Sequence, residues 1–115
     1  MDTSKHSALK FIELGVGSAE GIGEFFSSVF GWSFSEMGDG GQGWFDLPGL
    51  KIGVHGGDPD SGFVPYFKVA DIEAAIEKVR EAGGSADDRI AEEEGFGRFC
   101  NCQGPSGVKF GLHQP

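Results

Sequence analysis

A five-residue pattern, Lys-x-Gly-x-His with an apolar residue at each x, occurs twice and limits the fold of this chain more than any other feature of its sequence. Lys51-Ile-Gly-Val-His55 returns 58 positions later as Lys109-Phe-Gly-Leu-His113. Farther towards the N-terminus, Val16 and Val69 end two similar apolar stretches that lie 53 positions apart. Because both ends of a segment recur in the same order, we interpret the chain as two copies of one structural module.

The first copy has the pattern of a strand, a helix and three further strands. Residues 8–16 alternate apolar and other side chains, as a half-buried strand does. Residues 22–30 carry apolar side chains at the spacing of an amphipathic helix, with Ser18 as the expected N-cap and Gly31 as the end. An antiparallel meander is predicted by three stretches that glycine-rich or Pro-Gly turns separate: 32–36, 44–47 and 50–55.

The second copy repeats this order. A predicted strand over 64–69 precedes a helix that Asp71 is expected to cap and that Gly83 and Gly84 end. A strand, a capped helix and a terminating glycine therefore recur in the same order, which predicts the same local structure in both halves.

Two such modules predict an α+β fold. We expect a single domain over residues 1–115, with modules at about 8–55 and 64–113 joined by the loop 56–63. Neither βαβββ module can bury a sheet face alone, so the two are expected to form one cupped, mostly antiparallel sheet with one helix per module. The concave face of that sheet is the expected ligand site.

The charge of the chain argues against several partners. Nine Lys and Arg stand against 18 Asp and Glu, a formal net charge of -9. Nucleic acids and anionic membranes attract clustered cationic side chains, so we expect neither as a partner. No stretch approaches the roughly 18 consecutive apolar residues of a membrane span, and no signal-peptide pattern opens the sequence, which predicts a cytoplasmic protein. Cys100 and Cys102, two positions apart, are expected to be small apolar fillers of a strand.

At this point the chain resembles the vicinal oxygen chelate superfamily, the group of glyoxalases, bleomycin-resistance proteins and extradiol dioxygenases. The residues that carry the resemblance are Phe11-Ile-Glu-Leu-Gly-Val16 with Phe25-Phe-Ser-Ser-Val-Phe-Gly-Trp32, Tyr66-Phe-Lys-Val-Ala-Asp71-Ile with Glu81-Ala-Gly-Gly84, and Gly95-Phe-Gly-Arg-Phe with Gly104-Pro-Ser-Gly-Val-Lys-Phe-Gly-Leu112. The resemblance implies paired βαβββ modules and a homodimer. In metal-dependent members it also implies a divalent ion held by one residue from the first and last strands of each module.

The metal positions that the resemblance implies fall on residues without ligand atoms. Carried over one by one, they are Phe11, Gly53, Val64 and Gly111. A divalent ion needs imidazole, carboxylate or thiolate donors, so we expect no metal there and no other cofactor. Glyoxalase-type metal isomerisation and ring-cleaving dioxygenation are therefore not expected. A displaced metal on Glu13, His55 and His113 is an alternative, because a carboxylate and two imidazoles form a known ligand set.

Four polar side chains are predicted to face the concavity, because each lies two positions from one of those four residues in a strand. They are Glu13, His55, Tyr66 and His113. Under one hypothesis, Glu13 with His55 or His113 moves a proton on a small bound molecule, as general acids and bases do. Under the alternative, the histidines cap strand ends at a solvated rim and Glu13 pairs with Lys51 or Lys109.

These observations favour a protein that binds a small organic molecule without a metal. The residues expected to contact the ligand are Phe11, Trp44, Val64, Tyr66 and Lys109. A glyoxalase-like lyase or isomerase that uses Glu13 and a histidine for proton transfer is the second hypothesis. A purely structural or regulatory interaction is the third, because one fold can serve many functions.

Overall fold

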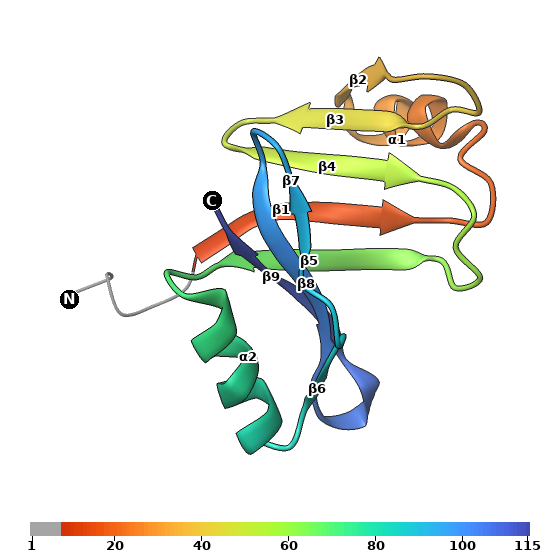
Figure 1. Ribbon diagram of the computed structural model, residues 1–115. Coiled ribbons are helices and arrows are strands. Elements are labelled where there is room, and N and C mark those ends of the chain that lie inside the picture. Colours follow the sequence, from red (N-terminus) through yellow and green to blue (C-terminus); the bar gives the residue numbers. More distant parts are fainter. Residues whose placement is uncertain (1–7) are drawn as a thin grey trace. The chain divides into compact units, whose positions relative to one another are not determined.

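A computed structural model describes residues 8–115. These residues form two compact units, one of residues 11–64 and the other of residues 65–115 together with residues 8–10. In each unit one helix packs against strands of a mixed, mostly antiparallel sheet (Figure 1). The predicted α+β class with one helix per module is therefore confirmed, whereas the single domain stays a prediction.

The unit of residues 11–64 contains one helix and four strands in the predicted order. They are β1 (Ala8–Gly15), α1 (Ile22–Phe30), β2 (Ser33–Glu36), β3 (Gly43–Leu47) and β4 (Leu50–His55). The strands lie in the order β2-β3-β4-β1, and β4 pairs with β1 in parallel while the other pairs are antiparallel. The predicted meander is thus present, and its last strand returns beside the first.

Helix α1 begins later than the sequence suggested. Its N-cap is Gly21, whose φ of 80° is a left-handed conformation that glycine adopts without strain. Ser18 does not cap the helix, because its hydroxyl accepts a hydrogen bond from the backbone N–H of Glu20 instead. The serine side chain therefore stabilises the turn before the helix.

The expected apolar face of α1 is only partly buried. Phe26 packs against Phe45, with ring centroids 5.9 Å apart, and Phe45 itself is fully buried. In contrast, Phe25, Val29 and Phe30 are more than half exposed. The predicted amphipathic helix therefore buries only part of its apolar side, and these three side chains extend beyond the stripe that the sheet covers.

The unit of residues 65–115 repeats the arrangement with one more strand. Its elements are β5 (Gly62–Lys68), α2 (Ile72–Glu81), β6 (Ser85–Ala86), β7 (Ala91–Glu93), β8 (Gly97–Gln103), a 3₁₀ turn η2 (Pro105–Gly107) and β9 (Lys109–Gln114). The strand order is β5-β9-β8-β6, with β5 and β9 parallel, and β7 also pairs with β8. Asp71 caps α2 as predicted, since its carboxylate accepts the N–H of Ala74 at 3.1 Å.

The core of this second unit lies between α2 and the strands β8 and β9. Ile72 and Ile76 of the helix pack with Cys100, Cys102 and Leu112, all nearly inaccessible to solvent. The cysteines are therefore core residues, as the sequence predicted.

The internal repeat extends to individual backbone contacts. The N–H of Val16 donates to the carbonyl of His55 at 3.0 Å, and the N–H of Val69 donates to that of His113 at 2.8 Å. These residues are related by the same offsets of 53 and 58 positions that the sequence shows. The first and last strands of each module are thus aligned in the same register.

The described residues 8–115 include no helix with the length and apolar character needed to cross a membrane.

Candidate functional site

The sheet of residues 11–64 has one apolar face and one polar face. Leu14, Phe45 and Ile52 point towards α1 and form the core. Side chains on alternate positions point the other way. Pairing places Trp44 opposite Gly53 and Gly53 opposite Glu13, so these three residues form one row across β3, β4 and β1. The face away from α1 therefore carries the candidate site.

Glu13 occupies the space that Gly53 leaves open. A Cβ atom built on Gly53 would lie 2.7 Å from both carboxylate oxygens of Glu13, closer than real contacts allow. A glycine at this position of β4 is therefore required for the carboxylate to lie flat across the neighbouring strand. Gly53, which has no donor atom at an implied metal position, therefore also makes room for Glu13.

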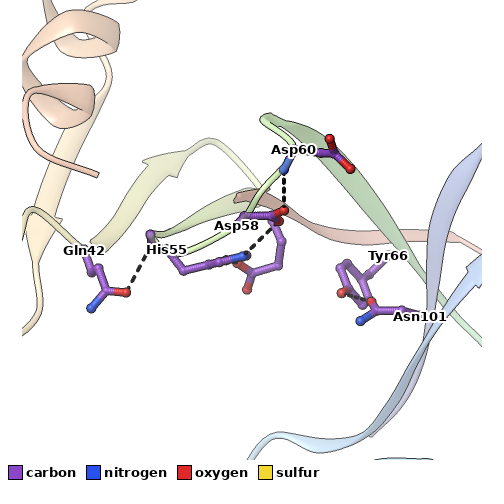
Figure 2. Close-up of polar contacts among 8 residues, drawn as sticks. Gln42, His55, Asp58, Asp60, Tyr66 and Asn101 are labelled. Atoms are coloured by element: carbon purple, nitrogen blue, oxygen red, sulfur yellow. Dashed lines mark hydrogen bonds and ion pairs between the residues drawn. The ribbon is translucent and has the colours of Figure 1, made fainter. Parts of the chain in front are cut away.

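His55 lies between two carboxylates. Its Nδ1 is 3.4 Å from Oε2 of Glu13. Figure 2 shows its contact with Asp58, in which Nε2 is 3.6 Å from Oδ2. The His55 side chain is 46% exposed, and each carboxylate side chain is 33% exposed. A small molecule can therefore approach these groups, while each ring nitrogen faces an acceptor.

The loop after β4 holds Asp58 beside the imidazole. The backbone N–H of Asp58 donates to the carbonyl of Val16 at 3.0 Å, and its Oδ1 accepts the N–H of Asp60 at 3.0 Å (Figure 2). A Cβ on Gly15 would overlap Oδ2 of Asp58 and lie 2.9 Å from Nε2 of His55. The absence of a side chain at Gly15 on β1 thus leaves room for the contact between Asp58 and His55, as Gly53 leaves room for Glu13.

A second side chain ties the same loop to the turn before β3. Oε1 of Gln42 accepts the backbone N–H of Gly56 at 3.2 Å (Figure 2). Neither Gln42 nor Asp58 was predicted as a site residue from the sequence. Asp58 lies three residues after His55, but its loop Gly56-Gly-Asp-Pro-Asp-Ser-Gly62 has no periodicity to indicate where a side chain points.

Trp44 is held in place by polar neighbours. Its indole N–H donates to Oδ2 of Asp46 at 3.2 Å, and Nζ of Lys51 lies 5.3 Å from the ring centroid. Lys51 Nζ is also 4.0 Å from Oδ1 of Asp46. Oε2 of Glu13 lies at ion-pair distance from His55, and Nζ of Lys51 lies at that distance from Asp46; the pairing of Glu13 with Lys51 or Lys109 stays a prediction.

Tyr66 takes the position of Glu13 in the unit of residues 65–115. It pairs with Gly111 as Glu13 pairs with Gly53, and a Cβ on Gly111 would overlap the tyrosine ring. The Tyr66 hydroxyl donates to Oδ1 of Asn101, and the tyrosine is buried (Figure 2). Asn101 was not predicted, because it follows from the register of β8 against β9.

His113 is buried. Its exposed fraction is 1%, its Nε2 lies 2.8 Å from the carbonyl oxygen of Phe96, and the Phe96 ring is 4.5 Å from the imidazole. The expectation of a partly solvated histidine at a rim is therefore wrong for His113, because the turn that bears Phe96 covers it. The same expectation agrees with His55, which ends its strand with nearly half of its side chain in solvent.

The remaining predicted contact residues lie in different surroundings. Phe11 is half-buried on the polar side of β1, two positions before Glu13. Val64 in β5 is also half-buried, whereas Lys109 is exposed at the start of β9 opposite Gln103. Their roles in ligand binding stay predictions.

Cys100 and Cys102 are free and buried. Burial raises the pKa of Cys100, and it raises the pKa of Cys102 to about 12. A thiolate is the reactive form of cysteine, so both side chains stay protonated and inert near neutral pH.

The residues at the implied metal positions do not fit a metal ion. Phe11 and Val64 have no donor atoms, and the spaces beside Gly53 and Gly111 are filled by Glu13 and Tyr66. Within residues 8–115 no three His, Cys, Asp or Glu side chains are arranged to hold a metal. The displaced site on Glu13, His55 and His113 thus has no support, and metal independence stays a prediction.

The two units have the same strand order, and in each one a helix packs on the strands. Residues 8–112 match the family model of the Glyoxalase/Bleomycin resistance protein/Dioxygenase superfamily. Because this match covers most of the sequence, the chain belongs to that superfamily, and the resemblance stated from the sequence is confirmed.

Several solved structures share the fold at low sequence identity. Methylmalonyl-CoA epimerase from Mycobacterium tuberculosis is 14% identical with a TM-score of 0.72, covering 100% of this chain and 93% of its own. A hypothetical protein from Bacillus halodurans C-125 is 16% identical with a TM-score of 0.73 and 96% coverage of both chains. A variant of Streptomyces coelicolor methylmalonyl-CoA epimerase in complex with 2-nitronate-propionyl-CoA is 14% identical, with a TM-score of 0.67 and coverage of 94% and 96%. No curated protein matches the sequence significantly.

Proposed function

We propose that this protein binds a small organic molecule, without a metal ion, on the polar sheet face that carries Trp44, Glu13 and His55. The observation that carries the proposal is the row of Trp44, Gly53 and Glu13 across three strands. A fixed indole beside a glycine offers an aromatic surface, and the carboxylate and imidazole beyond it offer hydrogen-bonding groups. Ligand sites in proteins combine these two features.

The charge of the site supports a particular class of ligand. Glu13 and Asp58 flank a single imidazole, and the chain as a whole carries a net charge of -9. Repulsion disfavours polyanionic ligands at such a surface. We therefore propose a neutral or cationic ligand with an aromatic or conjugated part, in contrast to the acyl-CoA compound bound by the Streptomyces coelicolor epimerase.

A thermal-shift screen tests the binding function. Small aromatic carbonyl compounds and aromatic amines form the panel, and propionyl-CoA is the polyanionic comparison. A ligand at 100 times its Kd stabilises the protein by about 2.7 kcal/mol, which raises Tm by roughly 10 °C. Binding should be lost in Trp44→Leu and kept in Lys78→Gln, which changes an exposed side chain of α2 outside the row. A panel without any shift, or shifts that Trp44→Leu retains, would contradict the proposal.

The contact between Glu13 and His55 supports a second function, a lyase or isomerase that transfers a proton. In this reaction Glu13 removes a proton from a carbon next to a carbonyl group. The carbon–hydrogen bond breaks, its electron pair stays on the ligand as an enolate, and the proton is then returned at another atom or face. Nδ1 of His55, 3.4 Å from Oε2 of Glu13, is close enough to receive the proton from the carboxylate and return it.

Exchange of substrate hydrogen with D₂O tests the second function without knowledge of the product. Carbonyl compounds that bind in the screen are incubated with the protein in D₂O, and loss of the α-hydrogen is followed by proton NMR. Glu13→Gln keeps the shape of the side chain but removes the base, so the exchange rate should fall by about 100-fold or more. Exchange that persists in Glu13→Gln would assign the base elsewhere.

A further inference from the structure

We infer that Gln42 is a further catalytic residue of this site: the NH₂ group of its side chain donates a hydrogen bond to the carbonyl oxygen of the bound molecule and stabilises the enolate that forms when Glu13 removes a proton. The inference rests on the proposed proton-transfer function, because an enolate forms only if Glu13 acts as a base. It also names the substrate class, a compound in which a carbon that bears hydrogen lies next to a carbonyl group.

Removal of this proton requires a partner for the carbonyl oxygen. When the carbon–hydrogen bond breaks, its electron pair forms a carbon–carbon double bond, the carbonyl π electrons move to the oxygen, and Glu13 takes the proton. In the proposed reaction without a metal ion, hydrogen-bond donors that are already in place have to stabilise the negative oxygen. A carboxylate such as Asp58 cannot do so, because it carries the same charge as the enolate.

The side-chain donors on β3 and β4 are all directed at carboxylates. The indole N–H of Trp44 donates to Asp46, and Nζ of Lys51 lies at ion-pair distance from the same carboxylate. Each ring nitrogen of His55 also faces a carboxylate. A donor for the enolate oxygen therefore has to come from the segments next to these strands.

Gln42 supplies such a donor, and its orientation is fixed. It directly precedes β3 and is exposed. Its Oε1 accepts the backbone N–H of Gly56 at 3.2 Å (Figure 2). Because a backbone N–H needs an oxygen acceptor, the NH₂ group has to be the other branch of the carboxamide. This group has no hydrogen-bond partner among residues 8–115, which leaves it to donate to a ligand.

Gln42 and Glu13 reach the end of β4 from its two sides. Strand β4 lies between β3, which Gln42 precedes, and β1, which carries Glu13. The Glu13 carboxylate contacts His55, the last residue of β4, and the Gln42 carboxamide contacts Gly56, the residue after it. A small carbonyl compound on this end of β4 can therefore place its acidic carbon at Glu13 and its oxygen at Gln42.

Gln42→Glu is a specific test, because one carboxylate oxygen can still accept the N–H of Gly56 while the other replaces the donor with a negative charge. At saturating carbonyl compound, the rate of hydrogen exchange in D₂O should fall by about 100-fold or more, since the lost donor acts on charge that develops during the reaction. The Kd of the compound should change by less than about tenfold, the usual effect of one hydrogen bond to a neutral group.

Gln114→Glu is the matched control. Oε1 of Gln114 accepts the backbone N–H of Ile72 at 2.9 Å in the other unit. The control therefore adds the same charge to the same kind of hydrogen bond, and it should keep the natural exchange rate.

Each outcome separates the role of Gln42 from the function. A natural exchange rate in Gln42→Glu, or an equal loss of rate in Gln114→Glu, would overturn the role of Gln42 and leave the proton-transfer function standing. If Gln42→Glu does not fold, proton NMR of the natural protein decides. The side-chain NH₂ signals of Gln42 should shift when a carbonyl compound binds, whereas those of Gln114 should not, and unmoved Gln42 signals would overturn its role. If the natural protein exchanges hydrogen in none of the compounds that bind, the proton-transfer function itself is wrong, and the role of Gln42 with it.

Discussion

The carboxylate of Glu13 lies over Gly53, its partner across the parallel strand pair β1 and β4. Tyr66 lies over Gly111 in the same relation in the other module. Both glycines are at positions where the superfamily resemblance implies metal ligands. The space that an inward-pointing ligand would need is thus taken in each module by a side chain from the first strand.

Gly53→Ala should disturb the site more than the fold. The three atoms nearest to the new methyl group belong to the carboxylate of Glu13, the end of a flexible side chain that can swing away. We expect unfolding free energy to change by less than about 1 kcal/mol, and ligand binding and hydrogen exchange to fall together because Glu13 leaves His55. Thermal denaturation and the exchange assay measure the two effects. A variant with natural binding would show that the position of Glu13 is unimportant.

Gly111→Ala should have the opposite balance. Its methyl group would meet the ring of Tyr66, which is buried and hydrogen-bonded to Asn101 and so cannot swing away. Overpacking of this kind costs about 1–3 kcal/mol, and denaturant titration should show it as a lower midpoint. The double variant Gly111→Ala with Tyr66→Ala should remove the overlap, but it also loses the packing of the tyrosine ring. If Gly111→Ala alone is as stable as the natural protein, the ring is not fixed as described.

The thiols should be unreactive in the folded protein and lower its stability at alkaline pH. Burial raises the pKa of Cys102 from 9.0 to about 12, so the folded state disfavours the thiolate. An unfolded chain releases the proton near pH 9, and the folded chain retains it. The contribution of Cys102 is therefore fully present below pH 9 and is lost as the pH rises from about 9 to about 12.

Comparison with Cys102→Ala isolates this effect from other groups that titrate in the same range. Unfolding free energy measured between pH 8 and pH 11 should fall less steeply in the variant. Thiol-specific reagents should modify the natural protein only under denaturing conditions. Rapid labelling of the folded protein at pH 8 would show that the thiols are accessible.

The homodimer expected from the sequence can be tested through solution mass. Helix α1 exposes 59% of Phe25, 55% of Val29 and 57% of Phe30, apolar surface that a second chain could cover. Light scattering at micromolar concentration should give twice the chain mass of 12.2 kDa. A monomer at all concentrations up to about 100 μM would refute the expectation, since stable dimers form well below that value.

Local patterns in the sequence were sufficient for the elements of the fold. The two copies of the Lys-x-Gly-x-His pentapeptide predicted equivalent last strands, and the hydrogen bonds of Val16 and Val69 have that equivalence. Asp71 was a reliable cap because its carboxylate bonds within its own helix turn. Ser18 was not a cap, because Gly21, three residues later, takes the N-cap position of α1 in a left-handed conformation.

The site depended on contacts that no local pattern encodes. Strand alternation places Glu13 and His55 on one face, but it cannot show that Asp58, in a loop without periodicity, completes the arrangement. Nor can it separate the two histidines of the repeat. His55 ends its strand in solvent, whereas His113 is buried under Phe96.

The sequence by itself determined the duplicated module, the absence of donor atoms at the four implied metal positions and the acidic character of the chain, because these depend on residue identity and spacing. Only the tertiary structure decided which carboxylates face His55 and which side chains fill the glycine spaces. Those contacts join residues as far apart as Glu13 and His55, and strand register and loop packing set their distances.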